Sequence, residues 1–233
     1  MRIKPLIGRG LLFVAAMMIL LTGCQPKEEG AKGAPMQKSF AEIAGTLERY
    51  GVTGTTEQML DELEESYARF SPEAESDKTL LLLSVLGSGD YDYSSRTFTP
   101  SHNGVYSFDT EVFDLEKAYT TFLVGVSALD EEELDFENVR EDTSQVNWEE
   151  GSGKTTIAFE WQGEQHVLEA RVRNDWFDLS VAGELNEIIK KHESGKQLYF
   201  TDDGYQGCIV FYRTQEWAKR FQEETGIDLH DGS

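Results

Sequence analysis

The histidines and cysteines are the residue types in this chain that could most readily bind a metal ion or act as nucleophiles. Its four histidines are scattered, at positions 102, 166, 192 and 230. No two of them have the i, i+4 spacing that places two zinc ligands on one face of a helix. His192 and Glu193 begin like an HExxH motif, but Lys196 occupies the position of the second histidine. The spacing of the histidines therefore predicts no transition-metal site.

Cys208 lies in an apolar segment, residues 207–211, with the sequence Gly-Cys-Ile-Val-Phe. A catalytic thiol needs a polarised environment, such as a helix N-terminus, and a histidine that accepts its proton. An apolar strand supplies neither of these. We therefore expect Cys208 to be a buried structural thiol.

Two further segments resemble ligand-binding loops only in part. Residues 151–155 end like a phosphate-binding loop, but Trp148 stands where the first glycine is needed and a strand-like pattern follows in place of a helix. We expect a turn between strands there. Residues 90–101 place Asp at the first and third positions of a calcium loop, but Ser at the sixth and twelfth positions. This pattern excludes an EF-hand and leaves a looser calcium site open.

The N-terminal residues have the layout of an export signal. Arg2, Lys4 and Arg9 form a basic region, an apolar run covers residues 11–21, and small residues precede Cys24. As a helix this run would be about 17 Å long, whereas the hydrocarbon core of a bilayer is roughly 30 Å thick. We therefore expect a cleavable signal and not a transmembrane helix.

The segment Leu21-Thr22-Gly23-Cys24 resembles the lipobox of bacterial lipoproteins, which has a leucine, two small residues and an obligatory cysteine. The resemblance implies transfer of a diacylglyceryl group to the Cys24 sulfur and cleavage between Gly23 and Cys24. Two or more acyl chains anchor a protein stably, where one is marginal. The implied location is the cell membrane, with the protein facing the extracytoplasmic side. The alternative is an ordinary secretory signal that holds a cysteine by chance.

The composition is strongly acidic. The chain has a formal net charge of −22, and loss of residues 1–23 removes three basic and no acidic residues, which leaves −25. Such a surface repels nucleic-acid phosphates, so we exclude nucleic-acid binding. It would suit a basic protein partner, although acidity also serves solubility alone. The 13 Phe, 9 Tyr and 4 Trp residues supply a core and exclude disorder of the whole chain.

The periodicity of the apolar residues predicts both helices and strands. Helical spacing covers residues 40–50, 56–70, 80–86, 115–128, 179–192 and 214–226. Thr55 or Thr56 and Asp114 are the expected N-caps of the second and fourth helices, and Gly87 is the expected stop of the third. Alternation predicts strands at residues 105–112, 136–148, 156–161, 166–172, 197–201 and 208–213. The last four of these form two hairpins.

These elements predict an α+β fold. We expect one antiparallel sheet of about five strands, built from hairpins and covered by amphipathic helices, with a helical N-terminal part. Residues 1–23 are the expected signal peptide, residues 24–38 a flexible tether, and residues 39–233 a single globular domain. A separate helical subdomain over residues 39–100 is the alternative.

Residues 88–104 form a connection without clear periodicity, longer than the ~12–15 residues usual for structureless loops. It carries three aromatic residues, Tyr91, Tyr93 and Phe98, among polar ones. Aromatic side chains supply contact area at low entropic cost, so these three are the candidate binding residues. The alternative is that their rings pack onto the core.

The sequence favours a non-catalytic, membrane-anchored binding or interaction module, because no catalytic, cofactor-binding or metal-binding motif is complete. One alternative is a cell-envelope hydrolase, whose carboxylates cannot be chosen among 43 acidic residues. Another is an inhibitor or immunity-type protein whose acidity complements a basic toxin or enzyme.

Overall fold

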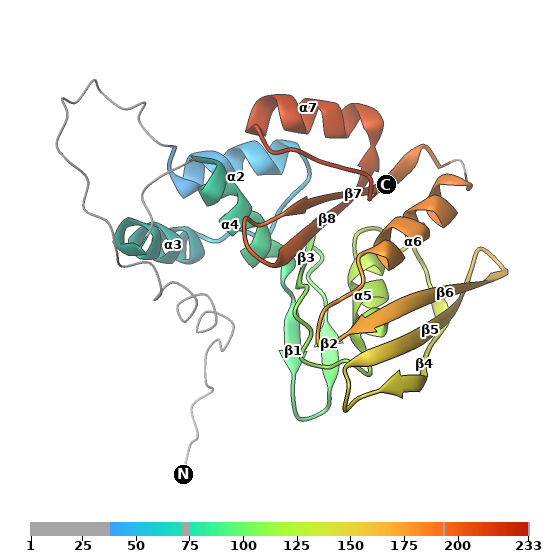
Figure 1. Cartoon of the computed structure of the whole chain (residues 1–233). Helices are drawn as coiled ribbons and strands as arrows, with labels where there is room; N and C mark the ends of the chain where they lie inside the picture. The colour runs from blue at the N-terminus through green and yellow to red at the C-terminus, as the bar shows by residue number, and fades with distance from the viewer. Residues whose placement is uncertain (1–37, 71–74, 193, 233) are drawn as a thin grey trace, which may run out of the picture.

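The computed structural model describes residues 38–70, 75–192 and 194–232 (Figure 1). The signal segment, Cys24 and the tether up to residue 37 lie outside these ranges. The described helices are α2 (Phe40–Arg49), α3 (Glu57–Phe70), α4 (Glu75–Gly87), α5 (Ala118–Ser127), α6 (Ser180–Lys190) and α7 (Gln215–Thr225). The described strands are β1 (Asp90–Asp92), β2 (Thr97–Thr99), β3 (Tyr106–Asp109), β4 (Glu137–Asn147), β5 (Ser152–Trp161), β6 (Glu164–Arg173), β7 (Lys196–Asp202) and β8 (Gly207–Thr214). Within these ranges, no helix is both long and apolar enough to cross a membrane.

The α+β class is confirmed, but the single five-stranded sheet is wrong. The strands form three small antiparallel sheets, with the orders β1–β2, β3–β8–β7 and β4–β5–β6. Both expected hairpins are present, β5–β6 and β7–β8, but each belongs to a different sheet. A hairpin turn fixes only the pairing of its own two strands. Tertiary packing decides whether two hairpins join into one sheet. Here helices lie between the two hairpins and keep them in separate sheets.

Helices α5 and α6 lie between the two three-stranded sheets. Helix α5 contacts β3 on one side and β4 on the other, and α6 contacts β7 and β6 in the same way. The apolar residues of this layer form the first core, which includes Phe122, Leu185, Ile157 and Val210. The two sheets thus join through side-chain packing, and an isolated bridge between Glu111 and Trp176 links the segments that follow β3 and β6.

Strand β8 is shared by two cores. Successive side chains on a strand point to opposite faces. Cys208, Val210 and Tyr212 accordingly face the first core, while Ile209 and Phe211 face a second core that is built with α2, α3, α4 and α7. Figure 1 shows these helices on the opposite side of the β3–β8–β7 sheet from β4–β5–β6. The helical N-terminal part therefore packs directly on the central sheet.

Several helix ends follow from their local sequence. Ser39 and Glu42 form a capping box at the start of α2, and Thr56 accepts a hydrogen bond from the Met59 N–H in the first turn of α3. Thr214 caps α7, which ends at the left-handed Gly226. Gly87 is the last residue of α4 and not a stop beyond it. A Cβ there would lie 2.6 Å from the Ser107 nitrogen, so close approach of β3 requires the glycine.

Asp114 does not cap a helix, contrary to the sequence prediction. Helix α5 begins at Ala118, and its N-cap residue Lys117 makes no side-chain capping bond. The Asp114 carboxylate instead accepts hydrogen bonds from Arg96 and Tyr91. Glu141 of β4 accepts the Thr120 N–H in the first turn of α5. Glu141, which is distant in the sequence, thus accepts a hydrogen bond at the start of α5, as had been expected of the neighbouring Asp114.

Candidate functional site

Residues 88–104, expected to be an irregular connection, contain the β1–β2 hairpin. Asp92 holds its turn by accepting hydrogen bonds from the Ser94 N–H and the Ser95 hydroxyl, both at 2.8 Å. These contacts, first of all the one from the Ser94 backbone, lower the pKa of Asp92. The carboxylate that resembles a calcium ligand in the sequence therefore already serves the turn.

Three aromatic rings gather beside this hairpin, and we call Tyr91, Tyr93 and Phe113 the hairpin aromatic cluster. Their ring centroids are 4.5 Å apart for Tyr91 and Phe113, 5.2 Å for Tyr91 and Tyr93, and 5.3 Å for Tyr93 and Phe113. Tyr93 and Phe113 are 63% and 64% exposed, respectively. Large exposed rings that touch one another are typical of interaction surfaces.

Hydrogen bonds to charged side chains fix the base of the hairpin aromatic cluster. The Tyr91 hydroxyl donates to Asp114 at 2.7 Å, and Arg96 binds both Asp114 and Glu116. Burial of the phenol and its bond to Asp114 raise the pKa of Tyr91 to about 12, and the Arg96 guanidinium keeps the pKa of Asp114 low. These contacts fix Tyr91, while the rings of Tyr93 and Phe113 stay open to solvent.

Phe98 does not belong to this surface. Its ring lies 6.1 Å from that of Tyr106 and packs against the first core. Of the three predicted residues, Tyr91 and Tyr93 are brought together and Phe98 turns inward. Phe113 completes the cluster from a segment that the sequence assigned to the approach to a helix.

More exposed rings lie near the same segment. Val112, the neighbour of Phe113, lines a cavity of about 10 Å³ together with Trp148 and Trp176. Both Trp side chains are nearly half exposed. Backbone hydrogen bonds from Val112 to Asp175 and from Phe177 to Thr110 join residues 110–112 to residues 175–177.

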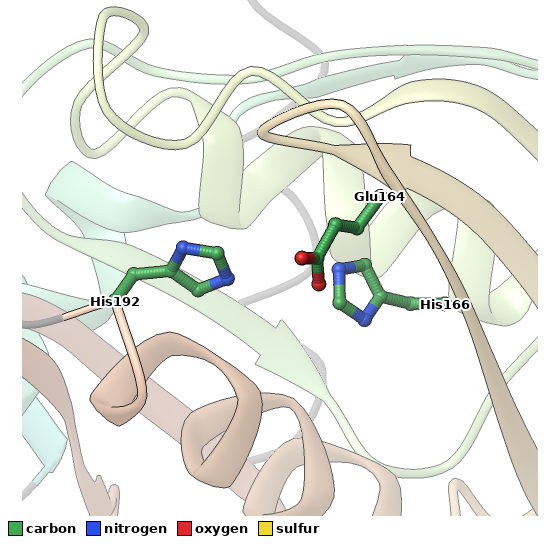
Figure 2. Close-up of side chains that lie close together, drawn as sticks. All are labelled: Glu164, His166 and His192. Carbon is green, nitrogen blue, oxygen red and sulfur yellow. The ribbon is translucent and has the colours of Figure 1, made fainter.

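A second group of side chains converges at the β5–β6 hairpin. Glu164 and His166 lie on β6, and His192 follows the C-terminal end of α6. One ligand atom from each of the three lies within 4.8 Å of the others. Figure 2 shows the carboxylate and the two imidazole rings turned toward one another. We call these residues the His–Glu cluster.

The walls of the His–Glu cluster are aromatic. The His166 ring stacks on Phe159, with centroids 5.3 Å apart and an interplanar angle of 28°. The His192 and Trp161 rings are in a T-shaped arrangement, with centroids 4.3 Å apart. His166 Nε2 is buried and has no hydrogen-bond partner. Such a buried nitrogen without a partner is rare and calls for an explanation.

The helical spacing of zinc ligands could not reveal the His–Glu cluster in the sequence. Glu164 and His166 are two residues apart on a strand, so they point to the same face. That spacing is a signal that could have been used. The third member, His192, reaches the site only through the packing of α6 on β6.

The thiol has the environment predicted for it, whereas the glycine-rich segment does not, because only Gly151 lies in a turn and residues 152–155 begin strand β5. Cys208 is buried and free, and burial raises its pKa to about 12. Strand β5 begins at Ser152, where a phosphate-binding loop would need a helix. Lys154 pairs with Glu169 on the neighbouring strand at 2.8 Å.

Glu141 is a further unusual carboxylate. Burial raises its pKa to about 7, although hydrogen bonds from Thr120 act in the opposite direction. Its Oε2 atom is buried without a partner. Since Oε1 accepts the Thr120 N–H, the group serves the start of α5.

No protein-family model, curated protein or solved structure matches the chain.

Proposed function

We propose that the protein is a lipid-anchored extracytoplasmic binding module that is not an enzyme. The observation that carries this proposal is the sequence Leu21-Thr22-Gly23-Cys24 behind a basic region and an eleven-residue apolar run. A cysteine in that context is the acceptor of a diacylglyceryl group. The polar segment that follows, rich in Gly and Pro, then serves as a tether between membrane and domain.

The hairpin aromatic cluster supports the binding role. Tyr93 and Phe113 present apolar area that the fold does not bury, while Asp114 and Arg96 hold the base of the cluster in one geometry. A preorganised surface loses little entropy when a partner binds.

The partner we propose is a basic protein. The exposed residues Asp90 and Asp92 flank Tyr91 in the sequence, and the exposed Glu111 lies two residues before Phe113. Aromatic faces and carboxylates both attract Lys and Arg side chains, the first through cation–π contacts. The strong negative charge of the whole chain would speed the encounter.

The anchor is tested with Cys24→Ser in the full chain. Wild type should incorporate labelled palmitate and sediment with membranes, whereas the variant should do neither. Cys208→Ser is the matched control and should behave like wild type. A Cys24→Ser variant that still carries the label and sediments with membranes would contradict the proposal.

The binding surface is tested by photo-crosslinking in intact envelopes. A photoreactive residue in place of Tyr93 should yield a discrete crosslinked product with a protein of high isoelectric point. The same residue in place of Lys219, which is exposed on α7, is the control and should not give that product. Equal products from both positions, or an acidic partner, would contradict the assignment of the surface.

A further inference from the structure

We propose that the His–Glu cluster binds one divalent transition-metal ion, with Zn²⁺ as the best match. This inference goes beyond the proposed anchor and binding surface and does not depend on either. It rests on how closely the three ligand atoms converge, on the orphaned nitrogen of His166, and on the chemistry of the ligand set.

The three ligand atoms are spaced closely enough to share one ion. None of the hydrogen bonds or ion pairs found among the described residues joins these groups to one another. Because each pair of ligand atoms is within 4.8 Å, some point lies no more than about 2.8 Å from all three. Zinc needs ~2.0–2.2 Å to imidazole nitrogen and carboxylate oxygen, so each ligand has to move by less than about 1 Å.

The cluster has one fixed ligand and two adjustable ones. Phe159 holds the His166 ring by stacking, whereas Glu164 and His192 are exposed. The exposed pair can close on an ion without disturbing the core. Metal coordination would also give His166 Nε2 the partner it lacks.

The ligand types select the metal. Two imidazoles and one carboxylate suit zinc and its neighbours among the transition metals, while Ca²⁺ and Mg²⁺ prefer oxygen ligands alone. Three protein ligands leave a fourth coordination position for water or for a group from a partner. The bound ion would tie the end of α6 to the β5–β6 hairpin.

Calorimetric titration of the full chain in detergent micelles with ZnCl₂ tests this inference. The protein carries no polyhistidine tag, and excess Ca²⁺ and Mg²⁺ occupy sites made of carboxylates alone. We expect one Zn²⁺ per chain. Glu164→Gln and His192→Ala should each weaken binding by at least about tenfold, since even outer-shell partners of a metal contribute that much.

His102→Ala is the matched control, because His102 is an exposed histidine outside the cluster that pairs with Glu131. It should bind zinc like wild type. Without zinc, Glu164→Gln should melt at the wild-type temperature, and zinc should raise the Tm of wild type and His102→Ala but not of Glu164→Gln. Equal affinity in all three proteins, or no binding in the presence of Ca²⁺ and Mg²⁺, would overturn the inference.

Discussion

Single carboxylates in this protein take roles that depend on partners far along the chain. Asp114 has the sequence position of an N-cap, yet it binds Arg96 and Tyr91 from the β1–β2 hairpin. A charged guanidinium forms a stronger hydrogen bond than a backbone amide, so Arg96 outcompetes the helix start for this carboxylate. Glu141 then approaches α5 from β4. No local pattern could reveal that exchange.

The raised pKa of Glu141 predicts that the stability of the fold depends on pH. Its pKa is raised to about 7 in the folded state, from 4.5 as the ordinary value. The folded state then binds more protons than the unfolded state between these pH values, so stability falls as pH rises through this window and the loss is complete above pH 7. Allowing for partial solvation, Glu141→Gln should be more stable than wild type by about 2 kcal/mol at pH 8 and about equal to it near pH 4.5.

Urea denaturation at the two pH values measures this difference. Glu137→Gln changes an exposed carboxylate of the same strand but keeps Glu141, so its stability should follow that of wild type at both pH values. If Glu141→Gln were less stable than wild type at pH 8, attraction of the carboxylate to the N-terminus of α5 would outweigh its burial.

At the level of elements, the sequence predicted what local patterns control. The cap at Thr55 or Thr56, the helix over residues 214–226 and both long hairpins depend on residues close in sequence. The structure has all three, with Thr56 as the capping residue. The β1–β2 hairpin was missed because its strands are only three residues long, which is too short for their alternation to stand out. Association of strands into sheets was also missed, since it depends on contacts such as β3 with β8, about one hundred residues apart.

Variants of the aromatic residues in and near the β1–β2 hairpin distinguish a binding role from a packing role. Tyr93→Ser combined with Phe113→Ser removes exposed rings and should lower stability by at most about 1 kcal/mol, or ~2–4 °C in Tm. Phe98→Ser removes a ring that packs on the first core and should cost at least about twice as much. Thermal melts of the two variants beside wild type decide the matter. A larger loss in the double variant would mean that its rings serve stability and not recognition.

Considered as a whole, the molecule is organised around β8. Cys208, Val210 and Tyr212 belong to one core, and Ile209 and Phe211 to the other. The run of buried residues along β8 reflects this, because a strand covered on both faces loses the alternation of a half-exposed one. The sequence analysis placed these apolar residues in a strand but had no means to show that two cores meet there.

The shared strand predicts cooperative unfolding. Phe211→Ala creates a cavity in the second core and should cost about 3–5 kcal/mol. Because β8 also belongs to the first core, both cores should melt in one transition at the lowered temperature. Near-ultraviolet circular dichroism and calorimetry follow it, and Tyr93→Ser serves as a control with little loss. Two separated transitions would instead support an independent helical subdomain over residues 39–100.

The lipid anchor is the central claim, and the mass of the mature N-terminus tests it most directly. Protein purified from membranes is digested, and the N-terminal peptide is analysed by mass spectrometry. We predict a peptide that begins at Cys24 and carries a diacylglyceryl group on its sulfur. A peptide that begins at another residue, or an unmodified thiol at Cys24, would contradict the account.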